Sequence, residues 1–165
     1  MTPPEALVHL FQPWNDFYSH SKTAATIAIF LHTGGLLLAG GFAIAADRGT
    51  LRAVRGAGNR SYQIAELAAV HRWVVTGLAI VVVSGIALFT ADIETFWASW
   101  IYWAKMLLVA LLLVNGLVMT RHEAGLAKDP SEASPHWRGL QRAAVTSLVL
   151  WFVTTLAGVA LENLA

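Results

Sequence analysis

The sequence predicts an all-α integral membrane protein, a four-helix bundle preceded by an N-terminal amphipathic interfacial helix. Hydrophobic residues make up 56% of its 165 residues, charged residues only 13%, and the mean hydropathy is +0.58. A soluble domain of this size has too little interior to hide so many apolar side chains. The apolar residues also form four runs, each close to the roughly 20 residues that a helix needs to cross a bilayer.

Four transmembrane spans follow from these runs. Residues 23–46 and 73–91 contain no Asp, Glu, Lys or Arg, which sets the first span at about 23–46 and the second at about 70–91. A third run, 95–120, is interrupted only by Lys105, and a fourth lies at about 140–161. We therefore expect one transmembrane domain over 21–165.

Residues 1–20 form a separate amphipathic segment. Its large apolar side chains recur at helical spacing: Leu7, Leu10, Phe11, Trp14, Phe17 and Tyr18. This pattern is typical of a helix in the headgroup plane of a bilayer, and a cap packed over the bundle would use the same face. The segment lacks the basic start and apolar core of a signal peptide, so we expect it to remain on the mature protein.

The charged residues predict the orientation and exclude several functions. Lys and Arg gather around two connections, at Arg48, Arg52, Arg55, Arg60, Arg72, Arg121, Lys128, Arg138 and Arg142. The positive-inside rule places these connections in the cytoplasm and both termini outside. A net charge of +1, from 11 Lys and Arg against 10 Asp and Glu, provides no basic excess for nucleic-acid binding, so that class is excluded. The absence of cysteine excludes disulfides, thiolate metal sites and Fe–S clusters.

One polar group from each span falls near the centre of the membrane. His32, in a stripe of small residues along the first span, lies about 4 Å to the outer side of the centre, as Lys105 does in the third. Ser84 and Thr154 lie about 3 Å to the same side in the second and fourth spans. The stripe predicts that His32 faces the bundle interior, because membrane helices pack through small residues.

Lys105 needs a partner at this depth, because an ammonium group at mid-bilayer costs a few kcal/mol. No Asp or Glu lies within the predicted spans. Three arrangements would satisfy it. Lys105 is a neutral amine hydrogen-bonded to His32, or its ammonium group faces a water-filled cavity, or it pairs with the anionic group of a cofactor such as a haem propionate. The alternative is that Lys105 snorkels to the outer interface.

His32 is a candidate axial ligand of a haem b iron. Gly35, one turn away, leaves room for a flat macrocycle, Trp151 is placed to stack on it, and Met106 is level with His32 as a second ligand. Ser84, Lys105 and Thr154 complete this predicted cofactor site. Alternatively, His32 fixes helix packing through a hydrogen bond to Ser84 or Thr154, or takes part in ion or proton transfer.

The remaining histidines are weaker candidates. His71, His122 and His136 lie at the cytoplasmic rim, where they would converge as metal or second-haem ligands. We take His71, together with His32, as the candidate metal ligand. The alternative for each rim histidine is a loose interfacial role.

The order of several motifs resembles an uncharacterised family of small bacterial four-helix membrane proteins, loosely related to the copper-resistance D-type proteins and the four-helix b-type cytochromes. The shared elements are an amphipathic start, LHTGG in the first span with Asp47-Arg48 at its end, HRW and SGIALF in the second, and FWASWIYWAK before the third. The resemblance implies a four-helix integral membrane protein of the bacterial inner membrane, with His32 and Lys105 at marked positions. It also implies a role in haem or copper handling or in electron transfer.

The expected function is therefore that of a haem-associated membrane protein, as an electron-transfer or anchor subunit of a larger complex. Its expected partners are the lipid bilayer and a further membrane subunit or a second copy of the chain. The alternatives are a structural accessory subunit without a cofactor, and a copper or proton transporter. The chain is not expected to be a stand-alone enzyme, because no extramembrane segment is large enough for a soluble active site.

The distribution of Lys and Arg makes the topology testable. Reporter fusions at Ala57 and at Ala165 are expected to lie on opposite sides of the membrane, with Ala57 in the cytoplasm. Enzymatic reporters that are active on only one side measure this directly. Cytoplasmic activity at both positions would contradict the orientation.

Overall fold

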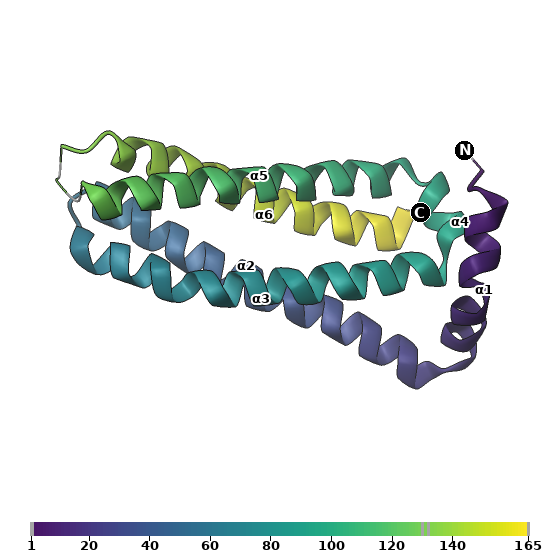
Figure 1. Cartoon of the computed structure of the whole chain (residues 1–165). Coiled ribbons are helices and arrows are strands. Elements are labelled where there is room, and N and C mark those ends of the chain that lie inside the picture. The colour runs from purple at the N-terminus through teal and green to yellow at the C-terminus, as the bar shows by residue number, and fades with distance from the viewer. Residues whose placement is uncertain (1, 130, 132, 165) are drawn as a thin grey trace.

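The computed structural model describes residues 2–129, 131 and 133–164, and the elements found there are all helical (Figure 1). The helices are α1 (Glu5–His20), α2 (Lys22–Val54), α3 (Arg60–Ala91), α4 (Ile93–Ala98), α5 (Trp100–Lys128) and α6 (His136–Leu164). Four of them, α2, α3, α5 and α6, are long and apolar enough to cross a membrane. The prediction of an all-helical chain with four such helices is confirmed.

The four long helices run side by side in two hairpins (Figure 1). Helix α2 packs along α3, α5 packs along α6, and α2 also contacts α6, which joins the two pairs. The α2–α3 and α5–α6 connections lie together at one end of the bundle, here called the loop end. Helices α1 and α4 lie with the C-terminus at the opposite end, the cap end, where α1 runs across the bundle axis.

Each helix is longer than the span predicted for it, and the third differs most. The predicted span starts at residue 95, whereas the chain forms the short helix α4, breaks at Ser99 and restarts as α5 at Trp100. Asp92 starts α4 by accepting a hydrogen bond from the backbone N–H of Thr95 at 3.2 Å. Extended dihedral angles at Ser99 (φ −77°, ψ 118°) then separate the two helices. Apolar content alone does not reveal this break, because α4 is as apolar as the start of α5.

Glycines bring the backbones of α2 and α3 close together. A Cβ atom on Gly77 would lie 2.6 Å from the backbone nitrogen of Ala39, and a Cβ on Gly35 would lie 2.9 Å from the Val81 side chain and 3.0 Å from the Gly77 carbonyl oxygen. Neither position has room for a larger residue. The small-residue stripe predicted on the first span is therefore the surface on which α3 packs.

Two further contacts hold the hairpins together. At mid-bundle, a Cβ on Gly40 of α2 would lie 3.2 Å from the Trp151 ring of α6, and Ala39 and Leu112 join this cluster. Towards the loop end, a second core cluster consists of Ala46, Leu67, Leu126, Trp137 and Leu140. The core thus combines small residues, which let the helices approach, with large Leu, Ile and Trp side chains.

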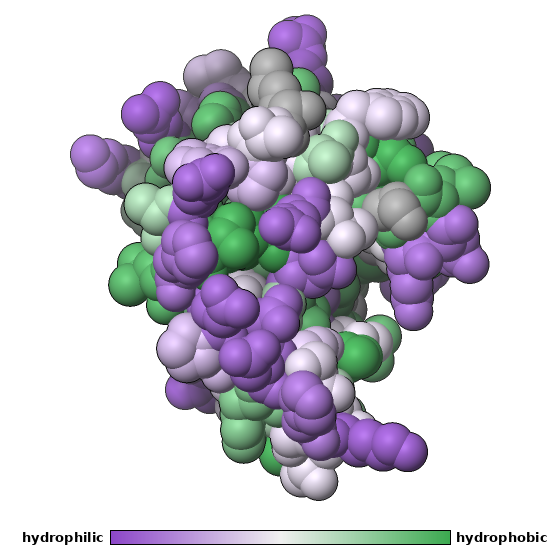
Figure 2. All heavy atoms as spheres, turned by 90° about the vertical axis from the view of Figure 1, so that its right-hand side faces the viewer, coloured by the Kyte–Doolittle hydropathy of each residue, from purple (hydrophilic) through white to green (hydrophobic). Residues whose placement is uncertain are grey.

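Large apolar side chains cover the outside of the bundle instead. Phe30, Leu37 and Phe152 are 71%, 73% and 67% exposed. In a view onto the cap end, hydrophilic side chains cover much of the end face and hydrophobic ones are visible at its sides (Figure 2). An apolar flank with polar ends matches the environment of a bilayer, in which lipid chains cover the flank.

Two neighbouring glycines provide a matched test of the α2–α3 contact. Gly35→Ala is expected to destabilise the bundle by about 1–3 kcal/mol through overpacking. Gly34→Ala is expected to leave stability unchanged or raise it by up to about 1 kcal/mol, because a Cβ there meets nothing within 4 Å and alanine favours helix. Unfolding of both variants in detergent micelles measures the difference. Equal stability of the two would refute the close approach.

Candidate functional site

His32 of α2 and Ser84 of α3 meet inside the bundle. The Nδ1 atom of His32 lies 3.1 Å from the Ser84 hydroxyl oxygen. Ser84 is 4% exposed and His32 is half-buried. The small residues of α2 allow this approach, because α3 comes close enough for a serine to reach across. Of the two partners that the sequence allows for His32, Ser84 is the one that it contacts.

The hydroxyl group of Ser84 determines which histidine nitrogen carries the proton. Ser84 has a single hydroxyl proton, and its oxygen lies 2.6 Å from the Ile80 carbonyl oxygen, to which it donates. Towards His32 it therefore acts as an acceptor, so Nδ1 of His32 carries the N–H. In the neutral ring this leaves the lone pair on Nε2. That lone pair is able to bind a proton or a metal.

Lys105 of α5 approaches the same region from the other hairpin. It is half-buried, and its positive charge acts on His32. Its Nζ atom would lie 3.7 Å from a Cβ placed on Gly158 of α6, one helical turn closer to the cap end than Thr154. The side chain thus lies against α6 at Gly158.

The other four predicted cofactor residues, Gly35, Met106, Trp151 and Thr154, differ in how far they are covered by neighbouring helices. Gly35 is covered by α3 and Trp151 packs on Gly40, so neither is open to a flat ring in this structure. Thr154 is 4% exposed, and its hydroxyl oxygen has no hydrogen-bond partner in the described part of the chain. Met106 is half-buried. The structure therefore assembles His32, Ser84 and Lys105, and uses Gly35 and Trp151 for packing.

At the loop end, two of the three rim histidines form a pair. The Nδ1 atoms of His122 on α5 and His136 on α6 are 3.3 Å apart. Each ring lies against a glycine of the opposite helix, His122 against Gly139 and His136 against Gly125, where a Cβ would overlap the ring. The pair is thus built into the α5–α6 hairpin.

His71 does not join this pair. It is exposed on α3, and its charge acts on Glu123 of α5. Within the described residues no group of three or more His, Cys, Asp or Glu side chains is placed to hold a metal ion. The predicted metal role of His32 and His71 therefore has no assembled ligand set behind it.

Asp47 is the polar residue whose position the sequence does not reveal. Paired with Arg48 after an apolar run, it marks the end of the first span, where a solvated carboxylate is the usual expectation. In the structure α2 continues to Val54, and Asp47 points inward with 1% exposure. Its spacing of seven residues from Gly40 is the available indication, because residues seven apart share a helix face.

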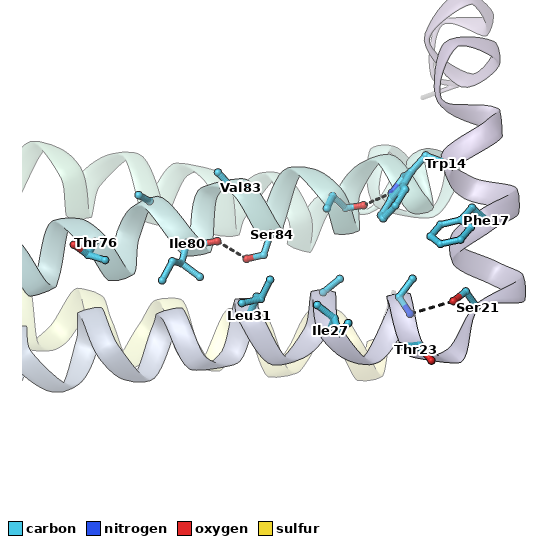
Figure 3. Close-up of a pocket in the computed structure, with 14 residues that line it drawn as sticks. Trp14, Phe17, Ser21, Thr23, Ile27, Leu31, Thr76, Ile80, Val83 and Ser84 are labelled. Atoms are coloured by element: carbon cyan, nitrogen blue, oxygen red, sulfur yellow. Dashed lines mark hydrogen bonds between the residues drawn. The ribbon is translucent and has the colours of Figure 1, made fainter.

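An apolar cleft of about 700 Å³ opens between α1, α2 and α3 at the cap end (Figure 3). Ile27, Leu31, Ile80 and Val83 are among the side chains that line it, and Ser84 is one of its few polar residues. Helix α1 closes the cap-end side of the cleft, held by a hydrogen bond from the Trp14 ring N–H to the Ala87 carbonyl oxygen at 2.8 Å.

The side chains that line the cleft indicate what kind of group it can hold. His32 is not among the lining residues, so its ring does not face the cleft. A cleft with so few polar groups takes hydrocarbon, and in a bilayer lipid chains supply it.

The protonation of His32 is directly measurable. With ring ¹⁵N-labelled histidine, NMR is expected to show His32 as the neutral tautomer protonated on Nδ1, and Ser84→Ala is expected to remove this preference. Thr90→Val is the matched control, because Thr90 bonds only within α3, to the Ile86 and Ala87 carbonyl oxygens. A wild-type His32 protonated on Nε2 would contradict the assignment.

Comparison with known proteins gives no relative to set beside this geometry. No protein-family model, no curated protein and no solved structure matches the chain.

Proposed function

We propose that the protein is a haem-associated integral membrane protein of the bacterial inner membrane, with His32 as an axial ligand of a haem b iron. The observation that carries the proposal is the hydrogen bond from His32 Nδ1 to Ser84, which orients the ring and leaves Nε2 free. Metal-binding histidines generally donate their second ring nitrogen to such an acceptor, which fixes the tautomer. A haem bound here would supply one-electron transfer.

The residues around His32 fit part of a haem site. Gly85 of α3 leaves the His32 ring uncrowded, since a Cβ there would lie 3.3 Å from its Cε1 atom. Lys105 supplies a cation for an anionic propionate. Because Gly35 and Trp151 are covered, a macrocycle would have to use the surfaces at Gly85 and Gly158 instead. Met106 stays the predicted second ligand.

The membrane setting of the proposal follows from charge and apolar surface. With the Lys- and Arg-rich loop end in the cytoplasm, the cap end, α1 and both termini lie on the outer face. Helix α1 then rests in the outer headgroup region, where its Phe17 is 56% exposed. A bundle with a single haem would pass electrons to a partner, so we propose an electron-transfer or anchor subunit of a larger membrane complex.

The second candidate is a structural subunit without a cofactor. The use of Gly35 and Trp151 in helix packing favours this candidate. The His32–Ser84 hydrogen bond would then serve only to stabilise the packing of α2 against α3. Such a bond contributes about 0.6–2 kcal/mol in a bilayer. The two candidates differ in whether Nε2 of His32 has an iron atom to bind.

An absorption spectrum tests the haem proposal. Protein purified from haem-replete cells is expected to show a Soret band that His32→Ala removes or shifts. His9→Ala is the control, because His9 is exposed on α1. A colourless wild-type protein that is folded and fully inserted would overturn the proposal in favour of the structural candidate.

Lys105→Met tests whether the Lys105 ammonium group helps to hold the haem. If Lys105 holds the cofactor, the variant is expected to insert at least as well as the wild type and to retain several-fold less haem. If Lys105 only snorkels, haem content will be unchanged. Lys22→Met at the exposed start of α2 is the control. Inserted yield and haem per protein, measured together, separate these results.

A further inference from the structure

Asp47 is a buried carboxyl group in the loop-end half of the bundle. It is 1% exposed, and its Oδ2 atom has no hydrogen-bond partner among residues 2–129, 131 and 133–164. Two side chains interact with the Asp47 carboxyl group: the hydroxyl of Ser147 on α6, which is neutral, and the carboxyl group of Glu123 on α5, which is itself acidic. Asp47 lies 15 residues from His32 along α2, or about 22 Å, so it is separate from the proposed haem site.

A charged Asp47 has little to compensate it. A buried carboxylate is costly unless it is paired or fully hydrogen-bonded, and a second carboxyl group nearby adds repulsion. The buried amide of Gln63 on α3 is already used, since its Nε2 donates to the Ala46 carbonyl oxygen at 3.1 Å and to the Thr50 hydroxyl at 3.2 Å. Arg48 and Arg142 are exposed.

We propose that Asp47 is a proton-binding site, which takes one proton from the loop-end side and holds it as a neutral carboxylic acid between α2 and α6. The step is a proton transfer: one carboxylate oxygen of Asp47 gains a proton, and the O–H bond of a hydronium ion at the loop end breaks to leave a water molecule. A neutral acid can donate to Ser147, which is 4% exposed and directly beside it. A bound metal ion is the weaker occupant, because the surrounding described residues provide no group of three metal-ligating side chains.

Two further ionisable groups lie near this site. The half-buried Glu123 of α5 acts electrostatically on Asp47, and the charge of the exposed His71 on α3 acts on Glu123. With Ser147, each of the four long helices thus contributes one side chain near the site.

Infrared spectroscopy of the full-length protein in lipid vesicles tests the site. The folded wild type at neutral pH is expected to show the C=O band of a buried protonated carboxylic acid. The band should be lost in Asp47→Asn and kept in Asp16→Asn, whose aspartate is exposed on α1. In Ser147→Ala, which removes one hydroxyl group, the band should shift to higher frequency because the acid loses its hydrogen-bond partner.

Several results would overturn the proposal. A folded wild type without this band between mild acid and neutral pH excludes a protonated Asp47 and needs no variant. Loss of the band in Glu123→Gln but not in Asp47→Asn would assign the proton to Glu123. A band that disappears when sodium is added at constant pH would show a cation site instead.

The test is independent of the haem proposal. Asp47→Asn is expected to leave the Soret band unchanged, and His32→Ala is expected to leave the carboxylic acid band unchanged. Failure of one proposal is therefore distinguishable from failure of the other.

Discussion

The close approach of α2 and α3 is the constraint on which the rest of the structure depends. Gly35 and Gly77 lie against each other and against Ala39 without room for a Cβ. Without a hydrophobic reward for association inside a bilayer, helices gain stability from dense contact of this kind. The same approach brings Ser84 within 3.1 Å of His32, so the polar contact at the proposed site is a product of the glycine contact.

The two polar regions of the bundle differ in what their neighbours supply. At His32 the ring has a partner on one nitrogen and a nearby cation in Lys105, so the free Nε2 is a defined acceptor. At Asp47 the neighbours are a hydroxyl group and a second carboxyl group, so the missing element is a proton. One region is thus suited to hold a ligand through a lone pair, and the other to hold a proton on an oxygen.

The large apolar residues have a secondary role in this architecture. Phe30, Leu37 and Phe152 face outward, where a bilayer would cover them, and the interior combines Ala, Gly and Ser with buried Leu, Ile and Trp side chains. A bundle of this kind has narrow inter-helix seams. Gly35 and Trp151 show the consequence, since residues that would border a flat cofactor are used to bring helices together.

The sequence by itself determined the number of long helices, their order and the face of α2 that turns inward. These follow from run length and from the spacing of small residues, which are local properties of the chain. It also indicated the meeting of His32 with Ser84, because equal depth in adjacent antiparallel helices leaves few other partners. Lys105 was placed in the same region for the same reason.

Only the tertiary structure decided which helix each small residue contacts, and therefore which side chains remain available. Gly35 and Trp151 are indistinguishable in sequence from residues that border a cofactor, and only packing against α3 and Gly40 assigns them. Asp47 was placed at a span end because a charge beside Arg48 normally marks the interface. Its burial depends on α2 continuing to Val54 and on the long-range packing of α6 against α2, which the apolar run of the first span does not reveal.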